Sequence, residues 1–177
     1  DALAAAGSLE AALGGPGALA GQRVLLLGAG GAARAVAFGV KARGAEVLVY
    51  NRTEERARKL AQEAGAACVH KAALRNASGI AAVVNATPLG MHPNVSQCPL
   101  EEDEIPAAAV VFDTVYVPLE TELLRRARRR GCRTLSGLAM FVAQGAAQFE
   151  LFTGQRPPVA IMEEAIRASL GGVEVGS

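Results

Sequence analysis

A short run of glycines has the composition and spacing of a phosphate-binding turn. Four aliphatic residues, 24–27, precede the segment Gly28-Ala29-Gly30-Gly31-Ala32-Ala33. Gly28 permits a tight turn, Gly30 lets a pyrophosphate approach the backbone, and Ala33 stands where a third glycine usually lets a helix pack close to a strand. A helix that begins near Gly31 directs free N–H groups and the positive end of its dipole at the phosphates. The segment is typical of dinucleotide binding.

The residues after the next apolar run indicate which dinucleotide is bound. An NAD site carries Asp or Glu about twenty residues beyond the glycines, where the carboxylate accepts a hydrogen bond from the ribose 2′-hydroxyl. This chain has Asn51, Arg52 and Thr53 there, and Arg56 one helical turn later. A guanidinium suits the 2′-phosphate that a carboxylate would repel, so we predict NADP, with added positive field from Arg34. The alternative is that Arg52 and Arg56 are ordinary solvated residues at a helix start.

Short apolar runs that alternate with helical patterns position these residues. The pattern predicts strands at 24–27, 46–50, 66–69, 80–86, 109–112 and 132–135, and helices at 1–13, 32–43, 54–64, 119–130, 137–152 and 159–170, with a short helix or turn at 71–76. This order predicts an α/β fold, a Rossmann-like, doubly wound, mostly parallel six-stranded sheet flanked by helices. Loops at the carboxyl ends of parallel strands line the ligand crevice. We therefore expect segments 85–91 and 113–118 beside the nicotinamide half of the cofactor.

Three helices carry further expectations. Thr53 can cap the helix 54–64. Leu119 should point inward from the helix 119–130. The arginines 125, 126, 128, 129 and 130 of that helix form either a solvated face, which we favour, or a surface for a partner or a nucleic acid. The helix 137–152 should bury Leu138, Phe141, Val142, Gly145, Phe149 and Phe152. Its glutamines at 144 and 148 are either plain surface, which the spacing favours, or donors aimed into a cleft.

Composition and charge narrow the class of protein. The 177 residues are 51% hydrophobic with a net charge of +1, which gives no argument for a nucleic-acid or membrane partner. Three widely spaced cysteines indicate reduced thiols in a cytoplasmic compartment, or a plastid if the source is a plant or alga. Cys68 and His70 alone do not make a metal site. We divide the chain into a leading helix and linker at 1–20, a nucleotide-binding domain at 21–136 and C-terminal helices at 137–177.

Five motifs follow one another along the chain: Gly28 to Arg34, Asn51 to Arg56, Asn85-Ala86-Thr87-Pro88-Leu89-Gly90-Met91, Asp113 to Tyr116, and Gly137 to Gln144. Together they resemble the NADP-binding C-terminal domain of the shikimate dehydrogenase family, in particular the dehydrogenase half of plant-type bifunctional dehydroquinate dehydratase–shikimate dehydrogenases. The resemblance implies an oxidoreductase of aromatic amino-acid biosynthesis that transfers hydride reversibly between NADPH and 3-dehydroshikimate, giving shikimate.

The same resemblance implies a role for each matching residue. Residues 28–33 would hold the pyrophosphate, and Asn51, Arg52, Thr53 and Arg56 the adenosine ribose phosphate. The nicotinamide side would be lined by Asn85, Ala86, Thr87, Thr114 and Gly137, and the substrate would meet Tyr116 and Gln144, which overrides the surface interpretation of Gln144. Asp1 falls where the family has a catalytic aspartate, although the Asn and Thr that precede that aspartate in the family are absent and an Asp at this position can be a helix cap.

The chain also departs from the family. The family's N-terminal substrate domain, with its pair of serines and its catalytic lysine, has no counterpart here, and Lys41, Lys59 and Lys71 lie away from any motif. We therefore expect a fragment that binds NADP with little or no turnover, and that would meet shikimate through the missing domain. Alternatives are a quinate or quinate/shikimate dehydrogenase, a glutamyl-tRNA reductase, and a non-catalytic nucleotide-binding module. The sequence does not give the oligomeric state.

Overall fold

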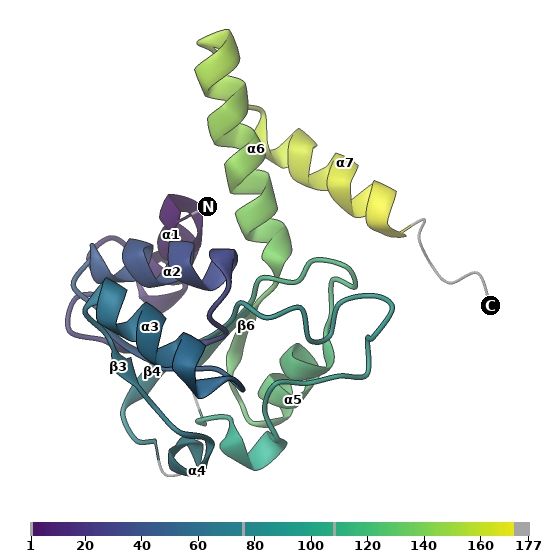
Figure 1. The fold of residues 1–177 in the computed structure, drawn as a ribbon. Helices are drawn as coiled ribbons and strands as arrows, with labels where there is room; N and C mark the ends of the chain where they lie inside the picture. Colours follow the sequence, from purple (N-terminus) through teal and green to yellow (C-terminus); the bar gives the residue numbers. More distant parts are fainter. Residues whose placement is uncertain (1, 76, 108, 172–177) are drawn as a thin grey trace.

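The computed structural model describes residues 2–75, 77–107 and 109–171 (Figure 1). Its helices are α1 (Ala2–Leu13), α2 (Gly31–Lys41), α3 (Glu54–Ala64), α4 (Lys71–Leu74), α5 (Glu122–Arg129), α6 (Gly137–Thr153) and α7 (Val159–Gly171), with a short 3-10 helix, η1, at Glu102–Glu104. Its strands are β1 (Arg23–Leu27), β2 (Glu46–Tyr50), β3 (Ala67–Cys68), β4 (Ile80–Asn85), β5 (Val110–Asp113) and β6 (Arg133–Leu135).

Within the described residues the strands form one six-stranded sheet in the order β3-β2-β1-β4-β5-β6, and every pairing is parallel. The chain builds outward from β1 to β3 on one side, then returns to start β4 on the other side of β1. The strands β1 and β4 are paired up to Leu27 and Asn85, but the chain that follows each of them leads to a different face of the sheet. Doubly wound sheets bind their ligands at this switch point. The fold class predicted from the sequence is confirmed, with a sheet that is wholly parallel.

Each face of the sheet has its own apolar core, because strands buried on both faces present aliphatic side chains in both directions. One core joins α1, α2 and α3 to the residues Val24, Leu26, Val49, Val84 and Phe112. The other joins α4, α5 and the segment 100–105 to Leu25, Leu27, Val83 and Val111. Ala and Val dominate the first core, so α1, α2 and α3 lie close to the sheet, whereas the second core consists mainly of Leu and Ile.

The helix α6 leaves the sheet after its first turns and projects away from it, with α7 packed beside it (Figure 1). Its buried residues are Gly137, Leu138, Val142 and Ala146. The predicted inward face is therefore wrong in part: Phe141 is 41% exposed and Phe152 is 84% exposed. The spacing identified an apolar stripe correctly, but the upper half of that stripe has no sheet beneath it.

Smaller differences from the predicted elements concern helix starts. The helix predicted from Leu119 begins at Glu122, because the Thr121 hydroxyl accepts a hydrogen bond from the Leu124 N–H at 3.3 Å and so caps the helix there. Thr53 occupies the cap position of α3 but makes no side-chain cap hydrogen bond. The predicted third strand shortens to two residues. Residues 172–177, at the end of the expected C-terminal unit, lie outside the described residues.

The α5 arginines are engaged by carboxylates. Arg126 binds Glu122 and Glu101, Arg129 binds Glu102, and Arg128 binds Glu120. These ion pairs favour the solvated-face interpretation of the basic cluster.

Among the helices that the structure describes, none combines the length and the apolar character needed to cross a membrane.

Candidate functional site

The turn after β1 is shaped by close packing against the loop that follows β4. Gly28 has a φ of +112°, and its N–H donates to the carbonyl of Tyr50 at 2.8 Å. A Cβ on Gly28 would lie 2.9 Å from the Ala86 carbonyl oxygen. Gly28 is therefore required both by its backbone conformation and by the approach of Ala86. The switch point is held tightly enough that only glycine fits there.

The next two glycines have open space in front of them. A Cβ on Gly30 or Gly31 would meet no heavy atom within 4 Å, and Gly30 is the N-terminal flanking residue of α2. Ala33 is fully buried, which fits its predicted role in close helix packing. Gly30 lines three adjoining cavities, so one continuous site runs across the carboxyl edge of the sheet around it. Open backbone at a helix N-terminus fits a pyrophosphate.

The end of β2 supplies cations to the same site. Asn51, Arg52, Thr53 and Arg56 line a cavity of about 490 Å³ together with Gly28 and Gly30. The Asn51 amide donates to the Thr53 carbonyl at 2.9 Å and so fixes the turn between β2 and α3. Neither Arg52 nor Arg56 makes an ion pair with another described residue. Two uncompensated guanidinium groups beside a backbone cradle fit a ligand with more than one phosphate.

Asn85 organises the loop on the other side of the switch point. Its side-chain oxygen accepts from the Thr87 N–H at 3.0 Å and from the Thr87 hydroxyl at 2.6 Å. The same hydroxyl accepts from the Leu89 N–H at 3.2 Å. Ala86 and Thr87 consequently line both the cavity that Arg52 lines and the neighbouring cavity that Tyr116 lines.

A fully buried carboxylate, Asp113, connects this loop to the next one. Its Oδ1 accepts from the Asn85 amide and from the Val115 N–H, both at 3.0 Å, and its Oδ2 accepts from the Thr121 hydroxyl at 2.6 Å. Burial raises the pKa of the Asp113 carboxyl to about 6, although the hydrogen bonds from Thr121, Val115 and Asn85 act to lower it. One carboxylate thus ties the ends of β4 and β5 to the start of α5.

Three of the residues expected on the nicotinamide side, Ala86, Thr87 and Thr114, line one cavity, and Asn85 and Gly137 do not line it. Ala86, Thr87, Thr114 and Tyr116 line a cavity of about 510 Å³ with Gly30. Gly137 lies directly behind it, since a Cβ on Gly137 would fall 2.2 Å from the Thr114 carbonyl oxygen. The ring of Tyr116 stacks on Phe141 at a centroid distance of 5.0 Å, which explains why Phe141 is not buried against the sheet.

Of the predicted site residues that the structure describes, Gln144 is not brought into this arrangement. Gln144 is half-buried on α6 and does not line the cavities around Gly30. Asp1, the candidate catalytic residue, lies outside the described residues. The interpretation of Gln144 as a substrate contact stays a prediction.

The structure also adds residues that the motifs did not mark. Lys71 and Cys98 line the same cavity as Arg52. His92 lines the same cavity as Tyr116, and Lys59 lines a third cavity with Arg56. The expectation that Lys59 and Lys71 lie away from the motifs is wrong, because Lys59 lines a cavity with Arg56 and Lys71 lines one with Arg52. The basic character of segment 52–59 was the available signal for Lys59. For Lys71 and His92 the sequence offered none.

The sheet order, the glycine cradle and the cations after β2 together define a dinucleotide-binding protein of the doubly wound α/β class. Comparison with known proteins identifies the family. The model of the shikimate / quinate 5-dehydrogenase family matches residues 10–87, and the model of the shikimate 5′-dehydrogenase C-terminal domain matches residues 137–167. The chain therefore belongs to the shikimate dehydrogenase family.

Individual relatives agree with the family models. The chain is 47% identical over 167 residues to the shikimate dehydrogenase (NADP(+)) of Moorella thermoacetica, covering 89% of this chain and 57% of that protein. It is 44% identical over 142 residues to the bifunctional 3-dehydroquinate dehydratase/shikimate dehydrogenase of Arabidopsis thaliana, covering 79% and 24%. The chain thus spans about half the length of the monofunctional relatives it matches.

Solved structures show the same fold. The shikimate 5-dehydrogenase of Thermus thermophilus in complex with NADP(H) and shikimate superposes with a TM-score of 0.77 at 44% identity, covering 83% of this chain and 55% of that one. A quinate dehydrogenase from Corynebacterium glutamicum in complex with NAD gives a TM-score of 0.73 at 35% identity, covering 83% and 55%.

Proposed function

We propose that this chain is the NADP-binding part of a shikimate dehydrogenase, which transfers hydride reversibly between NADPH and 3-dehydroshikimate to give shikimate. The observation that carries the proposal is the pair of cavities that share Gly30, one lined by uncompensated Arg52 and Arg56 and the other by Tyr116. A bound NADPH supplies the hydride. The chain's own residues hold the phosphates, fix the loops that face the nicotinamide and present Tyr116 toward the place of the substrate.

The choice of NADP rests on the charge at the end of β2. No carboxylate lines the 490 Å³ cavity in the described residues, whereas Arg52 and Arg56 do, and neither arginine makes an ion pair with a described residue. A ribose 2′-phosphate therefore meets cations, and a plain 2′-hydroxyl lacks its usual carboxylate acceptor. The similar enzyme of Thermus thermophilus with NADP(H) and shikimate supports the same assignment.

Tyr116 and Gln144 are the residues of this chain that support the proposed substrate. Tyr116 is 40% exposed at the cavity beside Thr114, and a phenol there can donate a hydrogen bond to a ring hydroxyl or carboxylate. Gln144 lies one turn beyond Phe141, which stacks on Tyr116, so α6 is the element that would bring an amide to the same substrate.

We further propose that α6 and α7, together with the leading segment 2–20, face a substrate domain. The large apolar side chains Leu151, Phe152 and Ile161 are 80%, 84% and 67% exposed on α6 and α7. Side chains of this kind gain about 1.5 to 3 kcal/mol each when buried. A cytoplasmic location belongs to the same proposal, since Cys68 and Cys98 are free thiols.

Joining this chain to the N-terminal part of the Moorella thermoacetica relative tests the reaction. The chimaera should reduce NADP⁺ when shikimate is added, and Tyr116→Phe should lower its turnover while NADPH binding stays intact. Turnover with quinate but not with shikimate would favour the quinate dehydrogenase alternative, to which the similar Corynebacterium enzyme points. Binding of NADPH with no turnover on either substrate would contradict the dehydrogenase assignment.

A further inference from the structure

We propose that Lys59 acts with Arg56 to hold the 2′-phosphate of NADP in the cavity between α2 and α3. The inference rests on the function proposed above and specifies where the phosphate that distinguishes NADP from NAD is held. It also assigns a role to a residue outside the five sequence motifs.

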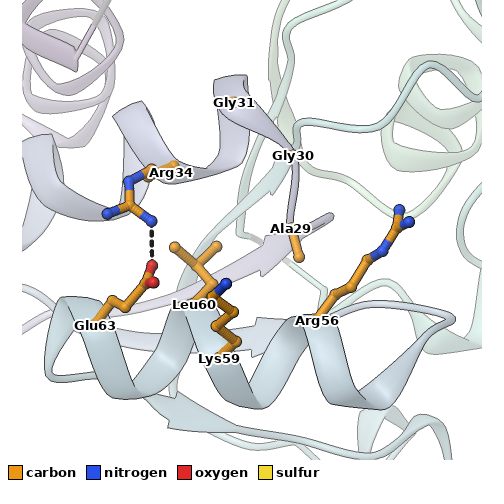
Figure 2. Close-up of a pocket in the computed structure, with 8 residues that line it drawn as sticks. All are labelled: Ala29, Gly30, Gly31, Arg34, Arg56, Lys59, Leu60 and Glu63. Carbon is orange, nitrogen blue, oxygen red and sulfur yellow. Dashed lines mark hydrogen bonds and ion pairs between the residues drawn. The ribbon is translucent and has the colours of Figure 1, made fainter.

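The cavity lies beside the glycine turn and has a volume of about 350 Å³. Its walls come from the turn, from Arg34 on α2, and from Arg56, Lys59, Leu60 and Glu63 on α3 (Figure 2). Ala29, Gly30 and Arg56 line both this cavity and the one that contains Arg52. A nucleotide whose pyrophosphate lies at Gly30 and whose ribose lies near Arg52 therefore has this cavity next to its 2′-position.

Ion pairing decides which of the cavity's charges remain available. Arg34 binds the Glu63 carboxylate and lies 5.4 Å from the ring centroid of Phe38. This ion pair closes one end of the cavity, and Lys59 lies along α3 between Glu63 and Arg56 (Figure 2). Arg34 is therefore neutralised, so the positive field expected of it from the sequence is largely cancelled by Glu63.

Arg56 and Lys59 have no such partner. Neither makes an ion pair with another described residue, whereas the neighbouring Arg58 on the same helix binds Glu54. The cavity thus retains two positive charges after Arg34 and Glu63 cancel. A phosphate monoester carries about −1.5 to −2 charges at neutral pH, so it matches this residual charge. The 2′-hydroxyl of NAD does not.

The matched pair Lys59→Met and Arg58→Met tests the proposal, because both residues lie on α3 and only Lys59 lines the cavity. Binding of NADPH and NADH is followed by nicotinamide fluorescence for the unmutated chain and both variants. We expect Lys59→Met to weaken NADPH binding about fivefold to tenfold, to leave NADH binding unchanged and to reduce the dependence of NADPH affinity on salt. Arg58→Met should change neither affinity by as much as about twofold.

Two results would overturn the inference while leaving the proposed function intact. One is a loss of NADPH affinity in Lys59→Met that is no larger than in Arg58→Met. The other is an equal loss for NADPH and NADH, which would show a general effect on the fold or on the pyrophosphate site. If the unmutated chain binds neither nucleotide, the proposed function itself fails. Adenosine 2′,5′-bisphosphate and ADP serve as a second pair of probes without the nicotinamide, and only the first should lose affinity in Lys59→Met.

Discussion

The Asn85 amide donates a 3.0 Å hydrogen bond to the Asp113 carboxylate at the carboxyl ends of two adjacent parallel strands. These residues are paired in register, and each is fully buried. Through Asn85 the contact reaches Thr87 and Leu89, and through Asp113 it reaches Val115 and Thr121. A single buried hydrogen bond thus fixes the relative position of both loops that border the proposed nicotinamide site.

Replacing Asp113 by Asn should make the stability difference between the two chains depend on pH. The folded-state pKa of about 6 lies above the ordinary value of 3.8, so the folded chain holds this proton more tightly than the unfolded chain does. The ionised carboxylate therefore costs stability above pH 6, and that cost is relieved as the pH falls through 6 toward 3.8. When the pH is lowered from about 7.5 to about 4.5, the free energy of unfolding of the unmutated chain should rise by roughly 2 kcal/mol relative to that of Asp113→Asn.

Urea unfolding of both chains at these two pH values measures the shift. Other titrating groups are common to the two chains and cancel in the difference. A difference in unfolding free energy that stays constant over this range would show that Asp113 does not titrate there. It would contradict burial as the dominant influence on the pKa of Asp113.

Changing Gly137 to Ala should destabilise the chain, while the same change at Gly31 should not. Both residues are the first of a helix, but a Cβ at Gly137 would lie 2.2 Å from the Thr114 carbonyl oxygen, whereas a Cβ at Gly31 has open space. We expect a loss of about 3 kcal/mol for Gly137→Ala and no loss for Gly31→Ala, measured by urea unfolding. Equal effects would mean that α6 can shift away from Thr114 at little cost.

Changing Gly30 to Ala should separate binding from folding. Its φ of −88° suits any residue and its added Cβ meets no protein atom, so the free energy of unfolding should stay within about 0.5 kcal/mol. The methyl group would stand in the open space proposed for the pyrophosphate, so NADPH affinity should fall at least tenfold in a fluorescence titration. Retained affinity would place the phosphates elsewhere.

Changing Arg52 to Met should weaken NADPH binding much more than NADH binding. A charged hydrogen bond to phosphate contributes about 1.5 to 3 kcal/mol, which corresponds to roughly a tenfold to hundredfold loss of affinity. The same titration with Arg125→Met serves as a control, because Arg125 lies on α5 and binds Glu122. An equal loss for both nucleotides in Arg52→Met would remove Arg52 from the choice of cofactor.

The sequence predicted the sheet and its ligand edge well, because local patterns determine them. The expected strand 46–50 and helix 54–64 match β2 and α3 in both bounds, since an apolar run followed by a helical apolar period leaves few alternatives. The glycine spacing likewise predicted the tight turn at Gly28, the open backbone at Gly30 and the close helix packing at Ala33. These features depend on neighbours within a few residues.

Features that depend on distant contacts could not be predicted. The exposure of Phe152 reflects where α6 leaves the sheet, and that point is set by the packing of Gly137 against Thr114 rather than by helical period. The neutralisation of Arg34 comes from Glu63, which is 29 positions away on another helix. The convergence of Asn85, Asp113 and Thr121 likewise requires the register of β4 and β5.

The central claim is that the site around Gly30 binds a dinucleotide and prefers the one with a 2′-phosphate. Calorimetric titration of the 177-residue chain with NADPH and with NADH, at the same salt concentration, tests it most directly. The account predicts one NADPH bound per chain and at least tenfold weaker binding of NADH. Equal affinities would contradict the role given to Arg52 and Arg56, and heat from neither nucleotide would contradict the proposed function.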